Sequence, residues 1–103
     1  MELIEPFLEM LAASRGAARN TIEAYRQDLE DFSGFAKGKL LQADGGRIQA
    51  YQAALSKRHY SPRSIARRLS ALRQFYRFLY EEGHRADDPT TGLEAPKQPK
   101  ALP

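Results

Sequence analysis

Apolar residues recur at the spacing of an α-helix in four stretches of the chain, residues 3–14, 20–37, 45–56 and 62–80. Steps of three and four residues place them on one face of each helix, and these faces are predicted to form the core. The core positions are Ile4, Phe7, Leu8, Leu11, Ile22, Tyr25, Leu29, Phe32, Ala36, Ile48, Tyr51, Leu55, Ile65, Leu69, Leu72, Tyr76 and Leu79. Because valine is missing and no stretch alternates like a β-strand, the predicted class is all-α, a compact four-helix bundle.

Polar residues at the predicted helix starts support these boundaries. Ser61 is expected to cap the fourth helix, with Pro62 at its first position, where the missing N–H costs nothing. Asp44 is expected to cap the third helix. Asn20 is expected to cap the second, and Glu23 three residues later would complete a capping box.

The composition changes after the fourth helix. Residues 85–103 contain four of the six prolines and show no helical period. They are predicted to form an extended interdomain linker, and residues 1–84 to form the folded domain. A linker at this place indicates that a second domain follows it in the complete protein.

The chain offers little chemistry for catalysis. It has 103 residues and no cysteine, which excludes disulfides and thiolate metal sites. His59 and His84 show no metal-ligand spacing, and no Gly-rich phosphate loop is present. We therefore expect no catalytic residue, no metal and no cofactor. No apolar run is long enough to span a bilayer, so we expect no membrane contact and a cytoplasmic location.

Positive charge is concentrated in the second half of the chain, although the net charge is only +3. Between Phe32 and Tyr80 the sole acid is Asp44. A long basic helix without acids at i,i+4 is typical of a surface that neutralises phosphates, whereas a merely solvated helix usually intersperses Glu with Arg. The predicted DNA-binding residues in and before the fourth helix are Lys57, Arg58, Ser61, Arg63, Ser64, Arg67, Arg68 and Arg73.

Positions within the fourth helix differ in their expected roles. Arg63 and Arg67 lie opposite the apolar stripe near the helix start, with Ala71 on a flank of the outward face, so these two arginines are the best candidates for DNA contact. Arg68 and Arg73 lie nearer the apolar edge, where their stems can cover the core. We accordingly expect Arg67→Ala to weaken DNA binding and to leave stability almost unchanged.

The start of the second helix is a further candidate anion site. Arg19, Asn20 and Thr21 offer a cation, free backbone N–H groups and a hydroxyl at the positive end of the helix dipole. A routine helix cap is the alternative interpretation of Asn20. Further along, the acidic group of Asp28, Glu30 and Asp31 is interpreted as lying on a solvated helix, where Glu30 and Asp31 would repel phosphate.

The order of these motifs resembles the N-terminal core-binding domain of bacterial tyrosine recombinases, most closely the Xer type. The resemblance covers essentially the whole chain. It is carried by NTIEAYRQDL at 20–29, RLS to FY at 68–76, and Pro96-Lys97 and Leu102-Pro103 in the linker. Asp88-Pro89 replaces the Asn-Pro usual in that family, and Gly45-Gly46 is unusual before the third helix.

The resemblance implies a SAM-like domain that forms half of a C-shaped clamp around duplex DNA at a recombination site. In that family the second and fourth helices approach the major groove, and protomers meet in a synaptic tetramer. A C-terminal domain carries the tyrosine nucleophile, so this fragment is expected to bind DNA without cutting it, in chromosome dimer resolution or in related integration and excision.

Two other classes of function compete with this interpretation. One is a helical protein-interaction domain whose basic face docks an acidic partner. The other is a helix-turn-helix regulator, which is disfavoured because no clear three- to four-residue turn joins two short crossed helices.

Overall fold

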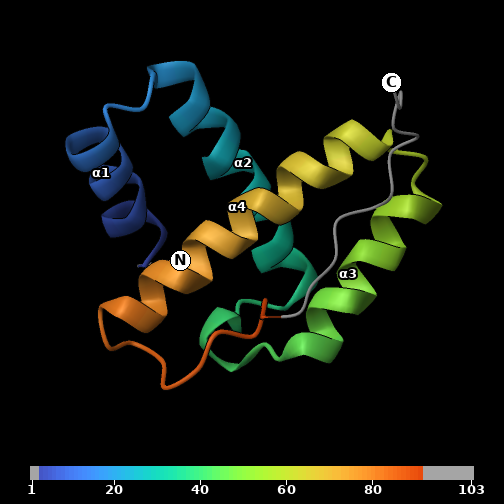
Figure 1. Ribbon diagram of the computed structural model, residues 1–103. Helices are drawn as coiled ribbons and strands as arrows, with labels where there is room; N and C mark the ends of the chain where they lie inside the picture. The colour runs from blue at the N-terminus through green and yellow to red at the C-terminus, as the bar shows by residue number, and fades with distance from the viewer. Residues whose placement is uncertain (1–2, 92–103) are drawn as a thin grey trace, which may run out of the picture.

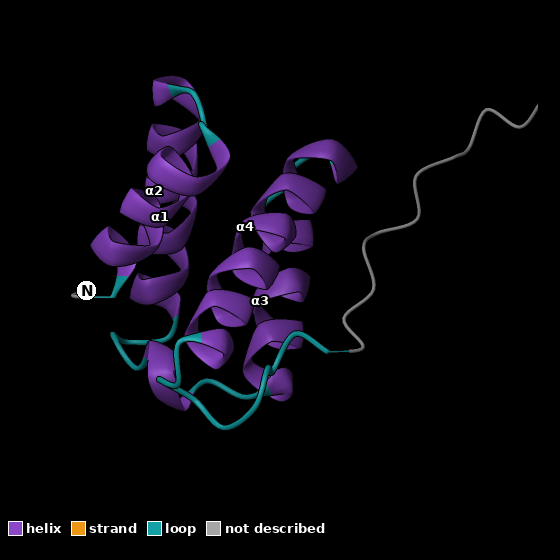
Figure 2. Cartoon of the chain, turned by 60° about the vertical axis from the view of Figure 1, so that its left-hand side comes forward, coloured by secondary structure: helices purple, strands orange, loops and turns teal. Residues whose placement is uncertain are grey.

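The computed structural model describes residues 3–91, and these residues form four α-helices and one short 3-10 helix. In chain order they are α1 (Ile4–Arg15), α2 (Arg19–Phe35), η1 (Leu40–Gln42), α3 (Gly45–Lys57) and α4 (Pro62–Glu81). Loops join the helices, and the described part of the chain contains no strand (Figure 2). The prediction of an all-α four-helix domain is confirmed. None of the described helices is long and apolar enough to cross a membrane.

Helix α4 is the centre of the domain because it packs against α1, α2 and α3 (Figure 1). Its predicted stripe is buried, and Leu69 and Tyr76 have no exposed surface. Phe75 is buried as well and meets the ring of Phe7 edge-on, with ring centroids 5.5 Å apart. Ala71 is fully buried too, so its expected place beside an outward face was wrong. A helix covered from three sides buries more than the single stripe that its period predicts.

The start of α2 differs from the prediction. Ala18 is the N-cap residue, without a side-chain cap, and Arg19 is already helical. Asn20 therefore lies inside the first turn, and the expected capping box with Glu23 is wrong. The boundary follows from packing, since Ala17 and Ile22 on either side of the start lie against the hydrophobic core.

The caps of α3 and α4 are as predicted. Asp44 accepts a hydrogen bond of 2.9 Å from the backbone N–H of Arg47. Ser61 accepts one of 3.1 Å from the backbone N–H of Ser64, with Pro62 at the first helical position. The short helix η1 was not predicted, and it buries Leu40, whose carbonyl oxygen accepts a 2.7 Å hydrogen bond from the Tyr76 hydroxyl.

The residues after α4 begin by packing on the domain. The Arg85 guanidinium donates a 2.6 Å hydrogen bond to the carbonyl oxygen of Ala43 and lies 5.3 Å from the centroid of the Tyr76 ring. Thr90 is buried. The first part of the predicted linker is thus attached to the bundle, whereas residues 92–103 lie outside the described part of the chain, and the linker over 85–103 stays a prediction.

Candidate nucleic-acid interface

The N-terminal half of α4 presents the most concentrated group of predicted site residues. Ser61 and Ser64 close its first turn, and their hydroxyls are 3.1 Å apart. Arg63, in the same turn, is exposed and makes no ion pair with any residue in the described range. Its guanidinium is available to an external anion. The free N–H groups at this end of the helix favour negative charge as well.

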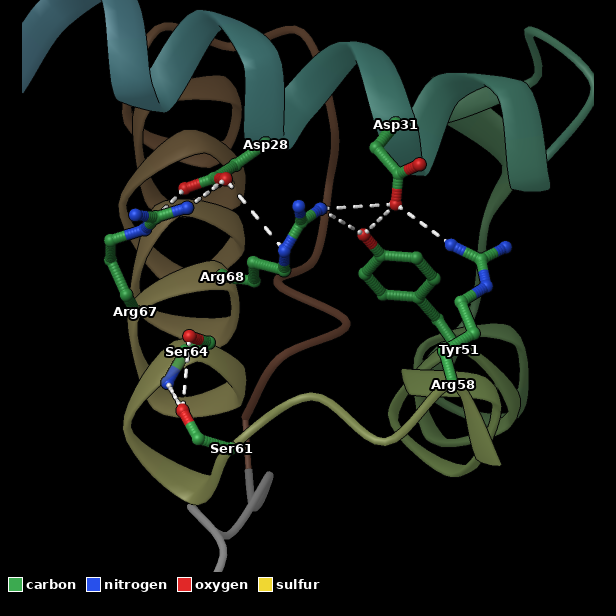
Figure 3. Close-up of polar contacts among 8 residues, drawn as sticks. All are labelled: Asp28, Asp31, Tyr51, Arg58, Ser61, Ser64, Arg67 and Arg68. Carbon is green, nitrogen blue, oxygen red and sulfur yellow. Dashed lines mark hydrogen bonds and ion pairs between the residues drawn. The ribbon is translucent and has the colours of Figure 1, made fainter. Parts of the chain in front are cut away.

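Arg67, one turn further along, is held by α2. Its Nε and Nη2 atoms donate hydrogen bonds of 3.2 and 2.9 Å to the two carboxylate oxygens of Asp28 (Figure 3). The Asp28 side chain is 1% exposed and that of Arg67 is 50% exposed. A buried carboxylate therefore fixes an arginine whose side chain is still half exposed.

Arg68 points inward between α2 and α3, where its side chain is only 14% exposed. Its Nη1 lies 3.1 Å from an Asp31 oxygen and 3.3 Å from the Tyr51 hydroxyl oxygen. Its guanidinium also lies over the Tyr60 ring, 4.7 Å from the centroid. Burial opposes the charge, but the pKa of Arg68 is raised because Tyr51 and Asp28 favour the cation. This arginine mainly joins three helices.

Asp31 receives hydrogen bonds from more than one neighbour. The Tyr51 hydroxyl donates at 2.5 Å and the Arg58 guanidinium at 3.4 Å (Figure 3). Burial raises the pKa of Tyr51 above its usual range, and its hydrogen bond to Asp31 adds to the effect. Its phenol therefore remains a donor at neutral pH.

An ion-pair cluster corrects the prediction of an unpaired basic face. We define this cluster as Asp28, Asp31, Arg58, Arg67 and Arg68. Three guanidiniums meet two carboxylates, which leaves one net positive charge. Helix α4 contains one acid, Glu81, which pairs with Arg77 at i,i+4 in the last turns, contrary to the expectation of a helix without such acids. Helix α2 supplies the acids for the arginines of the N-terminal half, so the basic face is not unpaired. The interpretation of Asp28 and Asp31 as a solvated acidic face was wrong. A signal was present in the sequence: Asp28 lies at the spacing of Tyr25, Leu29 and Phe32, on the apolar stripe itself.

The other predicted residues lie outside this cluster. Arg19, Asn20 and Thr21 are exposed in the first turn of α2, roughly 14 Å along the helix axis from Asp28. The first turns of α2 and α4 lie toward the same end of the molecule (Figures 1 and 2). Lys57 is exposed at the end of α3. Arg73 is half-buried and lines a groove with Arg15 and Arg77, away from the ion-pair cluster.

Residues 4–83 match the family model described as phage integrase, N-terminal SAM-like domain. The chain belongs to this family. This N-terminal SAM-like domain is similar to proteins named tyrosine recombinase XerD. It is 54% identical over 103 residues to the protein of Brucella suis biovar 1 (strain 1330). It is 50% identical over 102 residues to that of Caulobacter vibrioides and 48% identical over 103 residues to that of Rhizobium meliloti. These matches cover 97%, 96% and 97% of the chain, respectively, and 33% of each relative.

The fold of the SAM-like domain is shared with a solved structure, the integrase from mycobacterium phage Brujita. The TM-score is 0.83 at 20% sequence identity, and the match covers 99% of this chain and 34% of that one. The chain thus spans about a third of the length of its relatives. The family model carries the name of phage integrases, and the relatives carry the name tyrosine recombinase. Among residues 3–91, no group of three or more His, Cys, Asp or Glu side chains is arranged to hold a metal ion.

Proposed function

We propose that this domain binds duplex DNA as the N-terminal half of a clamp formed by a site-specific tyrosine recombinase in the cytoplasm. In the complete protein, a C-terminal domain cleaves and rejoins the strands, and further recombinase protomers complete a synaptic tetramer. The recombination resolves chromosome dimers or drives related integration and excision. The observation that carries the proposal is the cationic N-terminal end of α4, where the exposed Arg63 and the half-exposed Arg67 lie in the first two turns.

The charge that remains exposed after internal pairing supports this function. Arg63 and Arg19 are exposed cations in the first turns of α4 and α2, and Lys57 is exposed at the end of α3. Arg58 and Arg67 add side chains that are about half exposed. Phosphate oxygens are suited to such an array, because arginine presents several N–H donors in a planar fork. The DNA contacts predicted from the sequence remain proposals. The residues concerned are Arg19, Asn20, Thr21, Lys57, Arg58, Ser61, Arg63, Ser64, Arg67, Arg68 and Arg73.

A protein-interaction domain is the second candidate. The ion-pair cluster favours it, because its arginines already pair with carboxylates, the groups that an acidic protein partner would present. Both candidates would use the same face, so the chemistry of binding has to separate them. DNA binding releases condensed counterions and gives a steep linear dependence of log affinity on log salt.

The test is a mobility-shift titration of the domain against duplex DNA at several salt concentrations. Affinity is expected to fall by more than about tenfold between roughly 50 and 200 mM salt. Arg63→Ala is expected to reduce the magnitude of the salt slope by about 1, the loss of one phosphate contact. Affinity that does not change over this range would exclude phosphate contact and leave the protein-interaction domain.

Lys39→Ala is the matched control, since Lys39 is exposed in the loop after α2, at the opposite end of that helix from Arg19. It removes the same charge as Arg63→Ala. We expect it to leave the slope nearly unchanged. Equal effects of the two variants would show that net charge, rather than the end of α4, determines binding.

A further inference from the structure

The side chain of Asp28 occupies a position where the sequence pattern calls for an apolar residue. It lies on α2 between Tyr25 and Phe32, on the buried stripe, and it is 1% exposed. Removing a carboxylate from water is unfavourable, and an apolar residue of similar size often replaces a buried ion pair with no loss of stability. Stability alone therefore gives a weak reason for an aspartate here, which directs attention to what the carboxylate does to its partner.

The geometry of the pair leaves part of the Arg67 guanidinium unused. A guanidinium has five N–H donors, and Asp28 accepts from two of them, one on Nε and one on Nη2. Three therefore remain: the second on Nη2 and both on Nη1. The edge formed by Nη1 and Nη2 is the other face of the fork, and it can donate two parallel hydrogen bonds to a phosphate or to the O6 and N7 atoms of guanine.

We propose that Asp28 is a positioning residue for DNA recognition, which holds the Arg67 fork so that its free Nη1 and Nη2 edge meets the DNA. This role rests on the proposed DNA-binding function. The half-exposed Arg67 side chain is fixed before binding, so less conformational freedom is lost when the contact forms. Asp28 itself does not touch the DNA.

The proposal and simple electrostatics predict opposite results for Asp28→Asn. The variant removes one negative charge beside the DNA-binding face, so electrostatics alone predicts tighter binding. Positioning predicts weaker binding, because the amide offers Arg67 one acceptor oxygen and loses the charge-assisted fork. We expect the affinity of the domain for duplex DNA to fall by about tenfold at constant salt, the size of one good bidentate contact.

Glu30→Gln is the matched control for charge. Glu30 is exposed on the same helix two residues away, and it makes no ion pair within the described part of the chain. It undergoes the same change, a carboxylate to an amide, without a positioned arginine. The affinity of this variant for DNA is expected to be unchanged or higher. Its change in affinity measures the electrostatic effect of losing one carboxylate, and the affinity of Asp28→Asn is compared with it.

The experiment is a double-mutant cycle in which the dissociation constant for one duplex is measured for the wild type, Asp28→Asn, Arg67→Ala and the double variant. Each is measured at a temperature where circular dichroism shows it fully folded. We expect Asp28→Asn to weaken binding only when Arg67 is present. Arg67→Lys, which keeps the charge but not the fork, is expected to bind about as weakly as Arg67→Ala.

The outcomes separate this proposal from the proposed function. A wild-type domain that shows no salt-dependent affinity for DNA would end both. If the wild type binds DNA and Asp28→Asn binds equally or more tightly, the positioning role is wrong and the DNA-binding function stands. The same holds if Arg67→Ala binds like the wild type, or if Asp28→Asn weakens binding equally when Arg67 is already alanine.

Discussion

Replacing Arg67 by alanine tests whether the ion pair with Asp28 stabilises the fold. The change removes hydrogen bonds of 2.9 and 3.2 Å from a carboxylate that is 1% exposed. The neighbouring Arg68 Nε lies 3.9 Å from that carboxylate and makes no hydrogen bond with residues 3–91, so it does not replace the lost donors in its present position. The Asp28 carboxylate would remain buried with fewer hydrogen-bond donors to compensate for its lost hydration.

The expected cost follows from how far the pair is buried. Removing one partner of a fully buried pair costs about 3–5 kcal/mol. Arg67 is 50% exposed, and water can enter the space that it leaves, so screening lowers this value. We expect a loss of about 2 kcal/mol in the free energy of unfolding, which corresponds to a decrease of roughly 8–16 °C in Tm for a domain of this size.

Urea denaturation followed by circular dichroism measures this loss directly. Arg63→Ala is the control, and we expect it to stay within about 0.5 kcal/mol of the wild type because Arg63 is exposed and makes no ion pair in the described range. Adding Asp28→Leu to Arg67→Ala is expected to restore part of the stability, since a leucine suits the apolar stripe. An Arg67→Ala variant as stable as Arg63→Ala would refute the reasoning, and the sequence-based expectation would then be correct.

Three further predictions concern the caps, the core and the tyrosines. Ser61→Ala is expected to lower the unfolding free energy by about 1 kcal/mol, whereas Asn20→Ala should cost less because Asn20 is not a cap; urea denaturation compares them. Leu69→Ala is expected to cost about 2–5 kcal/mol in the same assay through a core cavity, while the folded variant keeps its DNA affinity. Burial raises the pKa of Tyr51 and of Tyr76 in the folded state. The stability that these two neutral phenols contribute is therefore fully present below the unfolded pKa of about 10, and it is lost as the pH rises beyond that value. Spectrophotometric titration of the folded protein should show Tyr51 and Tyr76 ionising above the ordinary tyrosine pKa of about 10, and ionisation of both near pH 10 would contradict this.

Local sequence signals determined where most of the helices lie and which residues enter the core. The helical period alone identified the buried Leu29, Phe32, Leu55 and Leu69. The caps Asp44 and Ser61 were also predictable, because a cap is a contact between residues three positions apart. Such features depend on neighbours in the chain, and the sequence lists those neighbours.

Tertiary structure decided the start of α2 and the environment of the arginines. Asn20 was available as a cap, but the packing of Ala17 and Ile22 on the core placed the helix start earlier. The charge pattern correctly showed that the N-terminal half of α4 is basic and has no acid nearby in sequence. It could not show that Asp28, which lies 39 positions before Arg67, reaches that arginine in space. Pairing across α2 and α4 depends on how the two helices cross, and no periodicity within either helix records that crossing.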